Sequence, residues 1–126
     1  DRGGPAGVRY LDIVDTIYTI TEFVEFGYRM LGNVTYRSGG IIYINLRNTA
    51  ARQLWVGPRR MPFFDPKETQ AQDIELRREI DPSNSRVSAI DVSNSVLLEL
   101  FDYFGWNPAS SQIKADQEKF YRRDFW

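Results

Sequence analysis

The 126-residue chain has 42% hydrophobic and 14% aromatic residues and a net charge of −1, which fits one globular domain and excludes a disordered composition. Histidine and cysteine are absent, which excludes imidazole catalysis, thiol nucleophiles, disulfides and the usual zinc sites. We therefore expect no cofactor and no metal ion. A cytoplasmic location is also expected, because disulfides are typical of oxidising compartments.

The first residues, DRGGPAG, are rich in glycine and proline and predict a linker or irregular lead-in over residues 1–8. A single domain is expected over residues 9–126. Because the chain starts at Asp1 rather than methionine, we expect a fragment of a longer protein. No apolar run approaches the roughly eighteen residues of a membrane span, so no membrane contact is expected.

Residues 9–31 predict one long amphipathic helix, because apolar side chains recur every three or four positions. The main stripe consists of Tyr10, Ile13, Ile17, Ile20, Val24 and Leu31. It is widened by Leu11, Tyr18, Phe23, Phe26 and Met30. Gly32 and Asn33 are residue types at which helices commonly end.

The next block predicts short strands over residues 34–37, 41–46 and 52–56, separated by turns at 38–40 and 48–51. In the second strand, alternation places Ile42, Ile44 and Leu46 on the inner face. Ile41 and Tyr43 then face outward. Residues 67–80 fit either an edge strand or a helix, and this alternative stays open.

Two more helices are predicted over residues 92–104 and 111–123. Asp91 or Ser93 is expected to cap the first, and Gly105 to end it. The i,i+4 pairs Lys114–Glu118 and Glu118–Arg122 support the second. The element order predicts an α+β domain, with a small antiparallel sheet of three to four strands and two or three helices packed on one face.

Catalytic motifs are not evident. The Ser38-Gly39-Gly40 stretch lacks the lysine and the following helix of a phosphate-binding loop, so it is interpreted as a hairpin turn. The acidic pairs Asp12–Asp15 and Glu22–Glu25 each lie one helical turn apart. Such pairs usually form the solvated face of an amphipathic helix, although a carboxylate-based enzyme remains a third hypothesis.

Charge is distributed unevenly along the chain. Between Glu25 and Asp65 there is no acidic residue, while six of the sixteen basic residues fall there, so the remainder carries −7. A basic, aromatic-bearing hairpin over residues 37–60 could contact phosphates and stack on bases. The candidate contact residues, for nucleic acid or for another partner, are Arg37, Tyr43, Arg47, Arg52, Trp55, Arg59 and Arg60. A pI near 5.5 argues against a dedicated nucleic-acid binder.

Aromatic residues also gather near the C-terminus. A core closed by Phe101, Phe104, Trp106 and Phe120 is expected. Phe125 and Trp126 follow the last predicted helix and are candidate oligomer contacts, either docking back on the domain or binding a second copy. Arg122 and Arg123 beside them could meet the acidic face of the long helix.

The segments LLELFDYFGWNP (97–108), IKADQEKFYRR (113–123) and IYINLRN (42–48) resemble the C-terminal accessory domain of bacterial Schlafen-like, AlbA-type DNA-binding proteins. The resemblance implies an accessory α+β domain in a nucleic-acid-linked or defence-related protein. It implies no nucleic-acid-contacting residue, because these segments do not include the AlbA-type part.

From the residues and the resemblance together, we expect a non-catalytic accessory domain. Its partner would be another domain of the parent protein or a second copy of the chain. The alternative is a nucleic-acid-binding module that uses the hairpin over residues 37–60.

Overall fold

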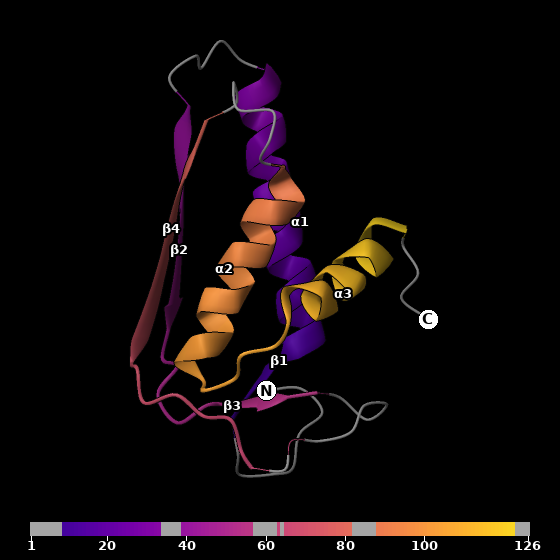
Figure 1. The fold of residues 1–126 in the computed structure, drawn as a ribbon. Helices are drawn as coiled ribbons and strands as arrows, with labels where there is room; N and C mark the ends of the chain where they lie inside the picture. Colours follow the sequence, from indigo (N-terminus) through magenta and orange to yellow (C-terminus); the bar gives the residue numbers. More distant parts are fainter. Residues whose placement is uncertain (1–8, 34–38, 57–62, 64, 82–87, 123–126) are drawn as a thin grey trace.

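The computed structural model describes residues 9–33, 39–56, 63, 65–81 and 88–122. Over these residues the chain forms the expected α+β domain, with three helices and four strands (Figure 1). The lead-in over residues 1–8, the short strand predicted at 34–37 and the C-terminal pair Phe125 and Trp126 lie outside the described residues. Among the described residues, no helix is both long enough and apolar enough to cross a lipid bilayer.

The N-terminal helix α1 (Ile13–Asn33) begins later than predicted. The preceding residues form a short strand, β1 (Tyr10–Asp12). The helix begins after Asp12 because the Asp12 carboxylate accepts a hydrogen bond from the backbone N–H of Asp15 at 3.0 Å, which is an N-cap interaction. The predicted start at residue 9 is therefore wrong, whereas the end falls at the expected Gly32-Asn33.

The four strands pair as two separate two-stranded ladders. Strand β2 (Gly40–Arg47) pairs antiparallel with β4 (Asp73–Ile80), from Gly40 opposite Ile80 to Arg47 opposite Asp73. The open alternative for residues 67–80 is thus resolved as a strand over its second half. Strand β3 (Gln53–Trp55) instead runs parallel to β1. Between β2 and β3 the chain turns at 48–51, where Asn48 and Ala51 have positive φ angles of 58° and 64°.

Helices α2 (Ala89–Tyr103) and α3 (Ser110–Arg122) complete the domain. The N-cap of α2 is Ser88, and Asp91 completes a capping box at the N3 position, so the prediction of Asp91 or Ser93 as the cap is wrong. Ser93 is instead buried and donates to the Ala89 carbonyl at 2.9 Å. Gly105 follows the helix with a φ of 76°, as expected for a C-terminal glycine.

The core lies between the β2–β4 ladder and the helices. Figure 1 shows α1 and α2 side by side on one face of this ladder, with α3 on the far side of the helices from it. The buried side chains come mainly from α1 (Ile13, Ile17, Ile20, Val24), from β4 (Ile74, Leu76, Ile80) and from α2 (Val96, Leu97, Leu100, Phe101). This arrangement confirms the predicted inner stripe for the four residues of α1, whereas Tyr10 lies in β1 and the Leu31 side chain lies outside the described part of the chain.

The predicted orientation of β2 is also confirmed. Ile42 is buried, whereas Ile41 and Tyr43 are 56% and 50% exposed. Ile44 and Leu46 are half-buried at the edge of the core. At Gly27 of α1, a Cβ atom would lie 3.3 Å from the Ile42 Cδ1 atom, so the glycine lets the helix and the strand approach closely.

The C-terminal aromatic residues close the core largely as predicted. Phe101, Phe104 and Phe120 are buried. Trp106 is half-buried and packs against Phe101 and Phe63, with ring centroids 4.9 and 5.2 Å apart.

Candidate interaction surface

The outer side of α1 carries three large exposed apolar side chains. Phe23, Phe26 and Met30 are 47%, 59% and 51% exposed, and their spacing of three and four residues puts them on one face of the helix. We call these three residues the outer stripe. The prediction that they widen the buried stripe is wrong, because the ladder and α2 cover only the face that bears Ile13, Ile17, Ile20 and Val24.

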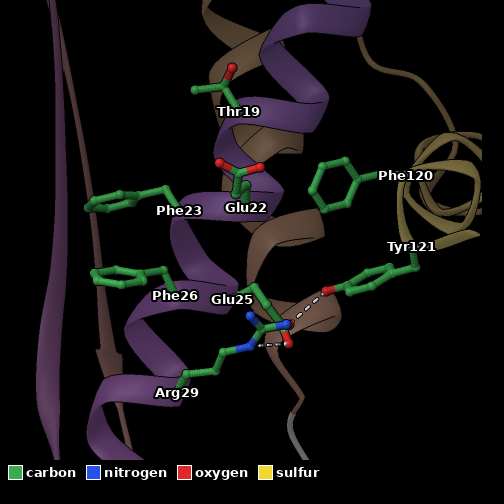
Figure 2. Close-up of a pocket in the computed structure, with 8 residues that line it drawn as sticks. All are labelled: Thr19, Glu22, Phe23, Glu25, Phe26, Arg29, Phe120 and Tyr121. Carbon is green, nitrogen blue, oxygen red and sulfur yellow. Dashed lines mark hydrogen bonds and ion pairs between the residues drawn. The ribbon is translucent and has the colours of Figure 1, made fainter. Parts of the chain in front are cut away.

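A groove of about 520 Å³ lies between α1 and α3, next to the outer stripe. It is lined by Thr19, Glu22, Phe23, Glu25, Phe26, Arg29, Phe120 and Tyr121. Figure 2 shows the rings of Phe23 and Phe26 one above the other on one side of α1, while Phe120 and Tyr121 extend from α3 on the other. We call this hollow the α1–α3 groove. Its lining combines aromatic side chains with charged ones.

Polar contacts tie the two helices together across the groove. The Tyr121 hydroxyl donates a hydrogen bond to Glu25 Oε2 at 2.8 Å, and Arg29 Nε lies 3.5 Å from Glu25 Oε1 (Figure 2). Partial burial, together with the bond to Glu25, raises the pKa of Tyr121 above the ordinary value for a phenol. Tyr121 is therefore a neutral donor at any physiological pH.

A buried polar network fixes α3 against the other two helices. The side-chain amide of Gln117, which is fully buried, donates to Thr21 Oγ1 of α1 at 3.0 Å and to Ser93 Oγ of α2 at 2.7 Å. Asn94 of α2 contacts Ser110 at the start of α3, with the Ser110 hydroxyl donating to Asn94 Oδ1 at 2.8 Å. These bonds set the position of one wall of the α1–α3 groove.

A further contact joins α2 and α3. Lys114 Nζ lies 3.2 Å from Asp91 Oδ1. The hydrogen bonds from Lys114 and Ser88 lower the pKa of Asp91 below its ordinary value. Lys114, which was expected to pair with Glu118 along its own helix, thus contacts the neighbouring helix.

The described members of the basic-hairpin set are not gathered at one place. Tyr43 and Arg47 lie on the outer face of β2, whereas Trp55 lies in β3 and Arg52 directly precedes it. Arg37, Arg59 and Arg60 lie outside the described residues. The structure therefore separates the described members of the predicted contact set between the two ladders.

On the β2–β4 ladder, the acid-free segment pairs with an acid-rich strand. Arg47 lies opposite Asp73 and Tyr43 opposite Arg77 in the register, and Glu75 and Glu79 alternate with Arg77 along β4. A hydrogen bond to the Glu75 carboxylate raises the pKa of Tyr43. On this face the charge of Arg47 is thus balanced by acidic residues of β4.

Arg52 and Trp55 contact other parts of the domain. The Arg52 guanidinium donates to the backbone carbonyls of Asn48 at 3.0 Å and Tyr10 at 3.1 Å, which ties the 48–51 turn to β1. Trp55 is half-buried and packs against Tyr10, with ring centroids 6.5 Å apart. Both residues therefore stabilise the β1–β3 ladder.

The part of the chain that the structure describes contains no cluster of three or more acidic side chains that could bind a metal ion. A smaller hollow of about 290 Å³ at the start of α1 includes Asp12 and Asp15. The Asp12 carboxylate is engaged as the helix cap, so Asp12 has a structural role at the helix N-terminus.

Sequence reasoning did not identify the α1–α3 groove. The signal was present as an excess of apolar residues on α1 beyond one stripe, but nothing local shows which stripe a neighbouring element covers. No protein-family model, curated protein or solved structure matches the chain. Function must therefore be inferred from the chemistry of this surface.

Proposed function

We propose that the chain is a non-catalytic accessory domain that acts through protein contacts at the outer stripe and the α1–α3 groove. The observation that carries the proposal is the contiguous exposure of Phe23, Phe26 and Met30 on one helix face. Exposed apolar patches rimmed by polar residues mark protein contacts. The polar rim here is supplied by Glu22 and Arg29.

The composition and the resemblance support the same function. A chain without histidine or cysteine has fewer routes to catalysis than most enzymes. Resemblance to the accessory domain of Schlafen-like, AlbA-type proteins is in keeping with a domain that contacts its neighbours. We place the protein in the cytoplasm on the absence of cysteine.

The nucleic-acid-binding alternative has weaker support. The ladder face that carries Tyr43 and Arg47 is balanced by Asp73 and Glu75, and Arg52 is bonded to backbone carbonyls of its own domain. Phosphate binding draws on uncompensated basic side chains, and the described residues do not gather them on one face.

Affinity retention on immobilised domain tests the proposed function. The immobilised wild-type domain should retain a polypeptide from an extract treated with nuclease. The Phe26→Ser domain should not retain this polypeptide. The matched control is Tyr103→Ser, which removes another exposed aromatic residue, 43% exposed on α2, away from the groove. Retention that disappears with nuclease, or that is unaffected by Phe26→Ser, would contradict a protein-contact function at this surface.

A further inference from the structure

The outward-facing residues of α1 follow the spacing of a coiled-coil seam. Thr19, Phe23, Phe26 and Met30 are separated by four, three and four residues, and all four are exposed. This alternation is the heptad pattern of a helix that packs lengthwise against another helix. The buried residues Ile13, Ile17, Ile20 and Val24 already pack α1 into the core. The second seam is therefore available to a partner.

The seam is complementary to itself when two helices run antiparallel. A two-fold axis between Phe23 and Phe26 places Phe23 of one copy opposite Phe26 of the other, and Thr19 opposite Met30. Four phenyl rings then lie at the centre of the contact, with the smaller and more flexible side chains at its ends. An interface of this kind is isologous, the commonest form in homo-oligomers.

Charges flanking the seam select the antiparallel orientation. Glu22 directly precedes Phe23 and Arg29 directly precedes Met30, so the two residues occupy equivalent positions on the same flank of the seam. When two helices pack antiparallel, these equivalent flanking positions of the two copies meet across the interface. Glu22 of each copy would then face Arg29 of the other, giving two ion pairs. Parallel packing would instead bring Glu22 toward Gly27 of the second copy, which carries no charge. Because flanking charges set the orientation of paired helices, the antiparallel arrangement is favoured.

Both charged side chains are accessible for such pairing. The Arg29 side chain is 70% exposed, and its contact with Glu25 spans 3.5 Å between Nε and Oε1. Exposed ion pairs such as Arg29–Glu25 contribute little to stability, so this contact leaves Arg29 able to pair with another copy. Glu22 is exposed on the same side of α1. In Figure 2 the rings of Phe23 and Phe26 project away from α3 and toward the side of the β2–β4 ladder, so α3 does not cover the seam, and both rings stay about half exposed.

We propose, on the basis of the function proposed above, that the partner at this surface is a second copy of the chain, bound through antiparallel packing of the two α1 helices. The contact buries the outer stripe of each copy. Glu22 and Arg29 set the orientation and the register.

Sedimentation equilibrium of the wild-type chain and of Phe26→Ser is the first test. The wild type should dimerise in the micromolar range. Phe26→Ser should raise the dimer dissociation constant by about a hundredfold or more, because each dimer loses two central aromatic side chains. Tyr103→Ser should sediment as the wild type does, and circular dichroism should show native helix content in all three.

A charge exchange tests the orientation. Glu22→Arg and Arg29→Glu should each weaken the dimer by about tenfold, because each converts both ion pairs into repulsive contacts. Mixing the two variants should restore association, since a heterodimer of one with the other again pairs opposite charges at both places. Failure of the mixture to associate would overturn the antiparallel register.

Two other outcomes would overturn the proposal. One is a wild-type chain that stays monomeric throughout the micromolar range, and the other is a dimer unaffected by Phe26→Ser. If the chain is monomeric but Phe26→Ser abolishes retention of a different polypeptide, the second-copy assignment fails while the protein-contact function stands. If neither dimerisation nor retention depends on Phe26, both fail.

Discussion

Replacing Gln117 with leucine is expected to destabilise the domain, although leucine is similar in size and more hydrophobic. Gln117 is fully buried in α3, and its amide donates to Thr21 Oγ1 at 3.0 Å and to Ser93 Oγ at 2.7 Å. Leucine offers neither bond. Two buried hydroxyl oxygens on two different helices would lose a donor at once.

The magnitude follows from these two bonds. A buried hydrogen bond contributes a net 0.5–1.5 kcal/mol, so the pair is worth about 1–3 kcal/mol. The third contact, from Asn94 Nδ2 to Gln117 Oε1, is long at 3.4 Å. Asn94 Nδ2 also donates to the Ser110 carbonyl at 3.1 Å, so its loss adds little. About 1–3 kcal/mol is a large fraction of the roughly 5–15 kcal/mol typical of a domain.

Urea unfolding followed by circular dichroism measures this change. The matched control is Gln112→Leu, which places the same substitution on the exposed face of α3 and should shift the unfolding free energy by about 0.5 kcal/mol or less. Hydrogen exchange should also be faster in α3 of the Gln117→Leu variant. A variant as stable as the wild type would show that the network does not hold α3, and the wall of the α1–α3 groove would need another explanation.

The remaining predictions concern Ser88 and Asp91 at the start of α2, the phenol of Tyr121 and binding of nucleic acid. Ser88→Ala should cost about 1 kcal/mol of unfolding free energy in urea, because it removes the N-cap of α2. Because the pKa of Asp91 is lowered from 3.8 in the folded chain, its contribution to thermal stability should be complete above that pH and lost as the pH falls below it, a dependence that Asp91→Asn removes. Because the pKa of Tyr121 is raised from 10.0, its contribution is complete below pH 10 and lost as the pH rises further, and Tyr121→Phe should flatten that alkaline loss. At physiological salt, fluorescence anisotropy should show generic nucleic acid bound only with a Kd of about 10⁻⁴–10⁻⁶ M, whereas submicromolar, steeply salt-dependent binding would contradict the protein-contact function.

Periodicity predicted the inner face of α1 correctly, although not its first residue, because one side of a helix repeats every 3.6 residues whatever it packs against. The buried residues Ile17, Ile20 and Val24 follow that repeat. Phe23 and Phe26 follow an adjacent apolar repeat on the same helix. Which of two neighbouring stripes is buried depends on where α2 and the ladder lie, and that is decided by contacts between residues far apart in the sequence.

Strand pairing shows the same division between local and long-range information. Alternation along β2 was sufficient to place Ile42 inside and Tyr43 outside. The pairing of β3 with β1 rather than with β2 had no local signal in the sequence. It joins residues such as Leu11, which precedes the long helix in the sequence, and Leu54, which follows it. The fold class was therefore predictable, whereas the division into two ladders was not.

Buried polar residues were the least predictable part of the candidate site. Ser93 and Gln117 sit on amphipathic helices, where a polar side chain normally indicates the solvated face. They are buried here because they bond to each other. Such pairs are visible only once the helices are assembled, so the network that positions α3 could not be inferred from either helix alone.

The two faces of α1 make folding and contact separable on a single helix. Val24 is fully buried and Phe26 is 59% exposed, although the two lie within one turn of each other. Truncating Val24 would open a cavity in the core, while truncating Phe26 removes surface that already faces water. Because the core holds α1 rigidly by its inner face, the outer stripe is presented in a fixed geometry, and little conformational entropy remains to be lost when it binds. A rigid apolar stripe flanked by charges of both signs therefore favours specific association over non-specific adhesion.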